Sequence, residues 1–69
     1  MLNENQARQI YMEEFPERYQ IPKGTAKMEI LISQAYRYVD GKLVKAWVFS
    51  DEEKYLNPIY IDMLTGKLI

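Results

Sequence analysis

The sequence predicts a small α+β domain in which an N-terminal helix packs on a three-stranded antiparallel meander sheet. Three observations favour this fold. The N-terminal segment repeats apolar residues at helical spacing, two later segments alternate apolar and polar positions on either side of an Asp-Gly pair, and a short alternating segment lies near the C-terminus. Short connections between consecutive strands give a meander, and the helix must bury its apolar stripe against one sheet face. We therefore expect residues 1–69 to form one domain.

Composition excludes several classes of site. The 69-residue chain contains no cysteine and no histidine. These two absences argue against a zinc or transition-metal site, a histidine acid or base and a cysteine nucleophile. The nine basic and ten acidic residues are interspersed and show no basic stripe of the kind that nucleic-acid binders carry. We predict no enzymatic activity, no cofactor, no metal and no nucleic-acid partner.

The first element is predicted to be a helix from Glu4 to Phe15. Asn3 is a suitable N-cap, and Gln6 stands three residues later, as in a capping box. Pro16 ends the helix because the residue before a proline is disfavoured in the α region. The apolar stripe of this helix consists of Ala7, Ile10, Tyr11 and Phe15.

The next segment, residues 16–25, is predicted to be a connection that either covers one end of the core or forms an exposed recognition loop. Residues 26–39 then favour a long strand, with a helix over residues 29–36 as the competing interpretation. One face of this strand is interrupted by Gln34. The members of that face are Met28, Ile30, Ile32, Tyr36 and Tyr38.

Asp40 and Gly41 predict a tight hairpin, because both residues adopt positive φ at low cost. The following strand, Lys42 to Ser50, has two different apolar faces. Leu43, Trp47 and Phe49 share one face with Lys45, and Val44, Ala46 and Val48 form the other. The pattern leaves open which face meets the helix. The face that does not is expected to form an exposed apolar patch and to mark an interaction site.

The second connection, residues 50–57, carries the acidic run Asp51 to Glu53. It is expected to be a solvated loop, with a weak cation site as the alternative. The last strand is predicted to start at Pro58, since a missing N–H is tolerated at the first residue of a strand, and a turn follows it. In that turn Gly66 supplies positive φ, while Asp62 and Thr65 can hydrogen-bond nearby backbone.

The segment Ile61-Asp-Met-Leu-Thr-Gly-Lys-Leu68 resembles the hydrophobic-Asp-x-x-Thr-Gly-x-hydrophobic pattern of PepSY-type domains. Residues 3–7 and 45–49 add supporting similarity. The resemblance implies a non-enzymatic domain of a helix on a small antiparallel sheet. It also implies a role in protease inhibition or regulation at the bacterial cell envelope, where such domains accompany propeptides of thermolysin-type proteases.

Three functional hypotheses follow: a binding or regulatory module that acts on a protease or companion domain, a structural domain of a larger surface protein, and a small cytosolic or phage-encoded adaptor that dimerises through its sheet. Location at the cell envelope follows from the resemblance, and the cytoplasm is expected if the chain is a complete protein. No stretch is apolar and long enough to insert into a membrane. The candidate interaction surface consists of Tyr36, Tyr38, Val44, Trp47, Phe49 and Tyr60.

Overall fold

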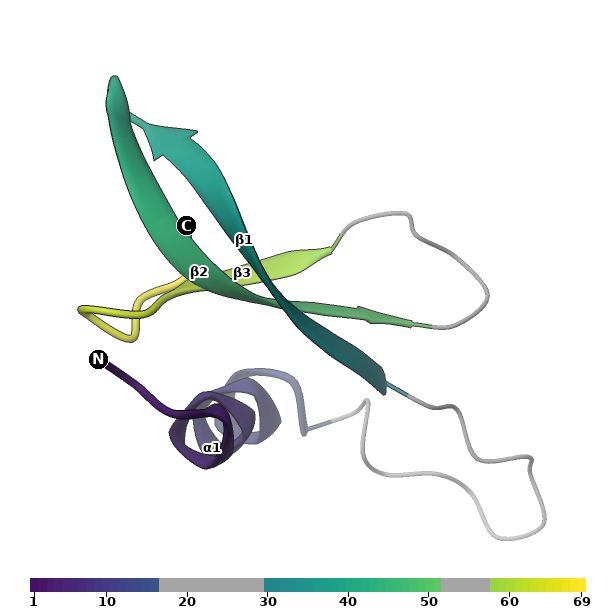
Figure 1. Cartoon of the computed structure of the whole chain (residues 1–69). Helices are drawn as coiled ribbons and strands as arrows, with labels where there is room; N and C mark the ends of the chain where they lie inside the picture. The colour runs from purple at the N-terminus through teal and green to yellow at the C-terminus, as the bar shows by residue number, and fades with distance from the viewer. Residues whose placement is uncertain (17–29, 52–57) are drawn as a thin grey trace, which may run out of the picture.

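The computed structural model describes residues 1–16, 30–51 and 58–69. In these ranges one N-terminal helix packs on a three-stranded antiparallel sheet, which confirms the predicted α+β fold (Figure 1). The sheet order is β1-β2-β3, as in a meander. Most of the predicted first connection, the expected strand start at residues 26–29, and Glu52 and Glu53 of the acidic run lie outside the described residues.

Helix α1, Glu4–Glu14, begins at the predicted cap. The Asn3 side chain accepts a hydrogen bond from the backbone N–H of Gln6 at 2.8 Å, and the Asn3 N–H donates to the Gln6 side chain at 2.9 Å. This reciprocal pair satisfies two backbone donors that the helix itself leaves free. The helix ends one residue before the predicted Phe15, which forms the C-cap and donates its N–H to Tyr11 O.

The sheet consists of β1, Ile30–Val39; β2, Lys42–Asp51; and β3, Ile59–Asp62. Asp40 and Gly41 connect β1 to β2 with φ angles of 50° and 79°, the positive values that a tight two-residue hairpin requires. This turn sets the register in which Val39 faces Lys42, Tyr38 faces Leu43 and, further along, Gln34 faces Trp47. The predicted turn role of Asp40 and Gly41 agrees with these angles.

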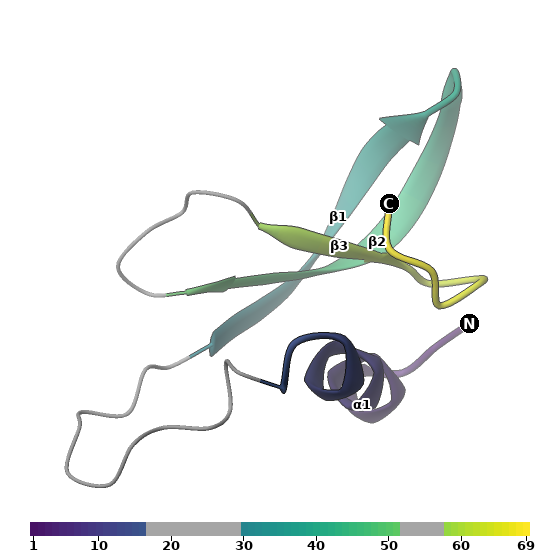
Figure 2. The same cartoon turned by 180° about the vertical axis from the view of Figure 1, so that it is seen from behind.

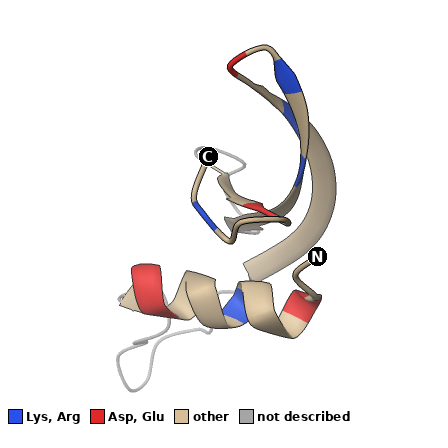
Figure 3. Cartoon of the chain, turned by 90° about the vertical axis from the view of Figure 1, so that its left-hand side faces the viewer, with Lys and Arg blue, Asp and Glu red and all other residues tan. Residues whose placement is uncertain are grey.

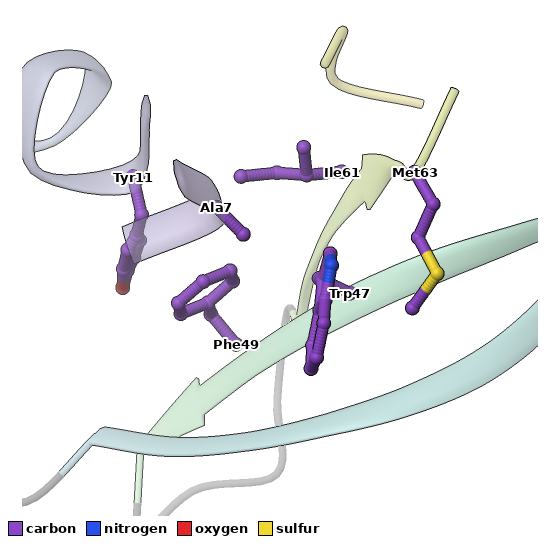
Figure 4. Packing of buried hydrophobic residues seen from close by; sticks show 6 residues of the cluster. All are labelled: Ala7, Tyr11, Trp47, Phe49, Ile61 and Met63. Atoms are coloured by element: carbon purple, nitrogen blue, oxygen red, sulfur yellow. The ribbon is translucent and has the colours of Figure 1, made fainter. Parts of the chain in front are cut away.

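The core lies between α1 and the face of the sheet that carries Trp47 and Phe49. Tyr11 stacks on Phe49 with ring centroids 4.4 Å apart and an interplanar angle of 14°. Figure 4 shows these side chains meeting between the helix and the sheet, with Ala7 beside them. The sequence pattern did not decide which face of β2 meets the helix. The structure shows that it is the aromatic face, which offers more apolar area for burial. The buried cluster comprises Ala7, Tyr11, Trp47, Phe49, Ile61 and Met63.

The N-terminus and the turn after β3 hold each other in place. The Leu2 N–H donates to Met63 O at 2.8 Å, and the Trp47 Nε1–H donates to Leu2 O at 2.9 Å. Gly66 lies against the side chains of Leu2 and Ile10. Figure 2 shows this turn beside the N-terminal end of the chain. The helix is thereby fixed under β2 and β3.

Candidate functional site

Three large side chains stand exposed together on the distal half of the β1–β2 hairpin. Tyr36 is 62% exposed, Tyr38 74% and Leu43 57%, and Tyr38 lies directly opposite Leu43 in the register. We call Tyr36, Tyr38 and Leu43 the hairpin patch. Leu43 lies on the same face of β2 as Trp47. Tyr36 and Tyr38 lie on the same face of β1 as Gln34, which pairs with Trp47, so the patch lies on the helix side of the sheet.

The exposure of the hairpin patch follows from the lengths of the elements. Eleven helical residues span about 16 Å, whereas ten strand residues span about 33 Å. The helix therefore covers one end of the hairpin and leaves the other end uncovered. Figure 1 shows the hairpin rising away from α1 toward its tip. Side chains of one face thus pass from buried at Phe49 to exposed at Leu43.

Lys45 brings a positive charge to the hairpin patch. Lys45 lies opposite Tyr36, and its Nζ is 6.0 Å from the centre of the tyrosine ring. Lys42 and Arg37 adjoin patch residues along the chain, but strand alternation places their side chains on the opposite face of the sheet. Asp40 is the one carboxylate between residues 36 and 45. Figure 3 shows the basic segments along the hairpin and acidic segments at both ends of the helix.

On the face of the sheet away from the helix, a cation–π contact covers part of β2. The Arg37 guanidinium carbon lies 4.5 Å from the centre of the Tyr60 ring. Arg37 faces Val44 and Tyr60 faces Val48, so the contact crosses β2 above Ala46. This position explains why Ala46 is fully buried on a face that no helix of the described residues covers.

This arrangement corrects the expectation of an exposed apolar patch on the face away from the helix. Val48 is buried there, Val44 and Val39 are half-buried, and Leu31 is exposed. The large exposed side chains lie instead on the helix side, beyond the end of the helix. Arg37 and Tyr60 account for the difference, because they cover β2 with their own side chains.

The predicted interaction surface divides into three groups. Trp47 and Phe49 belong to the buried core, so the proposal that they form an exposed surface is wrong. Val44 and Tyr60 lie half-buried on the opposite face, while Tyr36 and Tyr38 remain exposed on the helix side. The six residues therefore do not form one continuous surface.

Sequence reasoning missed Leu43 as a surface residue. The signal for it was the Asp40–Gly41 turn, since a two-residue hairpin pairs Val39 with Lys42 and hence Tyr38 with Leu43. Alternation alone placed Leu43 on the same face as Trp47 and could not separate the exposed residue from the buried one.

The turn after β3 has the hydrogen bonds that the motif suggests. Asp62 Oδ1 accepts from the N–H of Leu64 at 2.8 Å and from that of Thr65 at 3.4 Å. Thr65 Oγ1 accepts from the Lys67 N–H at 3.2 Å, and Gly66 has a φ of 74°. These three residues shape the backbone, and their polar atoms are engaged in doing so.

Within residues 1–16, 30–51 and 58–69, no three acidic side chains gather as a metal site would require. Helix α1 is too short and too polar to span a bilayer. Comparisons of the chain with protein-family models, with curated proteins and with solved structures found no match. The hairpin patch is therefore the feature of the described residues that points most directly to a function.

Proposed function

We propose that this domain is a non-enzymatic protein-binding module and that the hairpin patch is its contact surface. The observation that carries the proposal is the exposure of Tyr36, Tyr38 and Leu43 side by side beyond the end of the helix. Tyrosine is enriched in protein interfaces because it contributes a large apolar area and a polar hydroxyl with few rotatable bonds. A small domain that leaves such residues uncovered retains apolar area for a partner.

The charges around the hairpin patch favour a partner segment that carries carboxylates beside apolar side chains. Lys45 lies on the same face as the patch, with its Nζ 6.0 Å from the centre of the Tyr36 ring, and Lys42 precedes Leu43 at the hairpin turn. Charge of this kind raises the association rate and selects the partner more than it adds affinity. The preferred ligand is thus an acidic, partly apolar polypeptide.

We further propose that the partner is a protease of the thermolysin type and that the domain regulates it at the bacterial cell envelope. The support is the resemblance to PepSY-type domains, together with the hydrogen-bonded turn that Asp62, Thr65 and Gly66 form. A structural role in a larger surface protein is the second proposal. Under both, the companion protein or domain would contact the hairpin patch.

The test compares Tyr36→Ser/Tyr38→Ser with Leu64→Ser. Leu64 is 74% exposed, like Tyr38, but lies in the turn after β3 rather than on the hairpin. Hydrolysis of a peptide substrate by thermolysin is measured with increasing amounts of each variant. We expect the wild-type domain and Leu64→Ser to slow hydrolysis and the double variant to lose the effect.

A parallel titration with acidic peptides that contain leucine or phenylalanine, followed by amide chemical shifts, tests the wider proposal. Shifts at residues 36–45 are expected in the wild-type domain and not in the double variant. No inhibition combined with peptide shifts would remove the protease and keep the binding module. Shifts confined to α1 would contradict the hairpin patch as the binding surface.

A further inference from the structure

Strand β1 is the least buried element of the sheet. None of its ten residues, all of which the structure describes, is fully buried. The core cluster draws its buried members from α1, β2, β3 and Met63, whereas Ile30 and Ile32 of β1 pack only at the margin. In Figure 4, β1 runs along the side of β2 away from the helix, and none of the six labelled side chains comes from it.

The outer edge of β1 has no strand beside it within the described parts of the chain. The edge of β3 is different, because the C-terminal residues fold back along it. The Asp62 N–H donates to Lys67 O at 2.8 Å, and the Ile69 N–H donates to Tyr60 O at 3.0 Å. Only one of the two sheet edges is therefore covered by described residues.

Charged side chains normally protect an open edge from pairing with another strand. Arg37 is the only charged residue of β1. Its guanidinium lies over Tyr60 of β3, so the side chain extends inward across the sheet instead of guarding the edge. A ten-residue edge with Ile30, Ile32, Tyr36 and Tyr38 on one face is left without that protection.

The register identifies which backbone groups face outward. Val39 and Lys42 flank the two-residue turn, so they exchange hydrogen bonds, as do alternate pairs along the hairpin. The odd-numbered residues of β1 therefore bond to β2. The N–H and C=O groups of residues 30, 32, 34, 36 and 38 point outward. The Met63 N–H donating to Lys45 O agrees with this parity on the far side of β2.

We propose that two copies of this chain pair antiparallel through the outer edge of β1, with the two-fold axis at Gln34. The inference goes beyond the proposed function, because the partner is a second copy and the contact is the edge of β1 rather than the hairpin patch. A pairing centred on Gln34 matches every outward-facing residue of β1 with one in the second copy. A centre one residue to either side leaves one of the five unmatched.

The same register makes the side chains self-complementary. Tyr36 falls opposite Ile32 of the second copy, and Tyr38 falls opposite Ile30. Each exposed tyrosine thus gains an isoleucine neighbour that is only half-buried in one copy alone. On the other face Arg37 falls opposite Leu31, which is exposed, so no like charges meet. A two-fold interface needs this kind of self-match.

Pairing covers the backbone edge and the flanks of the tyrosines, and it leaves the helix-side face of the sheet open. The two hairpin patches then belong to one continuous six-stranded sheet. A larger partner could contact both patches together, which links self-association with the binding function.

The test places charges at the two-fold axis. Gln34 is exposed, so Gln34→Lys and Gln34→Glu leave the monomer fold intact. Each variant alone sets like charges opposite each other, and an equimolar mixture sets opposite charges together. By sedimentation over a concentration series, we expect each variant to dimerise about fivefold more weakly than wild type and the mixture to recover. Asn5→Lys and Asn5→Glu, on the exposed surface of α1, are the matched charge controls.

Amide hydrogen exchange supplies a readout that does not depend on any variant. Dimerisation should protect the amides of Ile32, Gln34 and Tyr36 as concentration rises, while Ser33 and Ala35 stay protected throughout. A wild-type chain that remains monomeric near 1 mM, roughly the dissociation constant of a weak complex, overturns the proposal. So does a dimer that both Gln34 variants leave unchanged. A strict monomer that still binds acidic peptides at the hairpin patch would remove the dimer and keep the proposed function.

Discussion

Gly66 combines two constraints at one residue. Its φ of 74° lies in the left-handed region, and a Cβ built on it would stand 3.1 Å from Ile10 Cδ1. Gly41 has a similar φ of 79°, but a Cβ built on it would have no atom within 4 Å. Substitution of Gly41 therefore tests backbone strain alone, and substitution of Gly66 tests strain together with close packing. The sequence does not distinguish these two positions.

We expect Gly41→Ala to lower the free energy of unfolding by about 1–2 kcal/mol, the cost of a left-handed alanine. Gly66→Ala should lower it by about 1 kcal/mol more, because the new methyl group crowds Ile10. Urea denaturation of both variants measures the difference. Adding Ile10→Val removes the crowded atom, so the double variant should lose less than the sum of the single changes. If both substitutions lower the free energy of unfolding equally, the contact between the turn and the helix is not tight enough to exclude a methyl group.

At the scale of elements, the helix depends on its cap and on its docking. Asn3 ends the N-terminal segment that Trp47 and Met63 hold through Leu2. The same residue starts α1 through its bond to Gln6. A change at Asn3 therefore tests how much the local cap adds to a helix that is also held by tertiary contacts.

Asn3→Ala should lower the free energy of unfolding by about 1 kcal/mol, because the Gln6 N–H loses its acceptor. Asn3→Asp keeps an acceptor at that position and adds a favourable charge at the helix N-terminus, so its stability should match or exceed that of the parent. Thermal unfolding followed by far-UV circular dichroism distinguishes the two. If Asn3→Ala and Asn3→Asp melt together, the cap contributes nothing beyond the docking of Leu2.

For the whole molecule, the core is small and concentrated at one end of the hairpin. Phe49 stacks on Tyr11 and is fully buried, while Leu43 on the same face of β2 is mostly exposed. A domain of this size has only a few kcal/mol of net stability. One core residue therefore decides whether the chain folds.

Phe49→Ala should cost about 3–5 kcal/mol and leave most of the chain unfolded at 25 °C. Leu43→Ala should change stability by no more than about 0.5 kcal/mol. Amide–proton spectra report the outcome, since a folded domain gives dispersed resonances and an unfolded one does not. A well-dispersed spectrum for Phe49→Ala would mean that residues outside the described core supply much of the stability.

Local signals in the sequence predicted most of the backbone. Asn3 with Gln6 located the helix start, Asp40 with Gly41 located the hairpin, and Gly66 located the last turn. Each signal works over two to four residues, because capping and positive φ are properties of the nearby chain. These elements and their order determine the α+β fold.

The tertiary structure decided which residues are buried. Alternation places Trp47 and Leu43 on one face of β2, but only the position and length of α1 make the first a core residue and the second a surface residue. The burial of Ala46 depends on Arg37 and Tyr60, which come from two other strands. The sequence alone thus determined the elements and the two faces of each strand. The reach of one short helix and one cross-sheet contact decided where the exposed hairpin patch lies, because burial depends on residues that are distant along the chain.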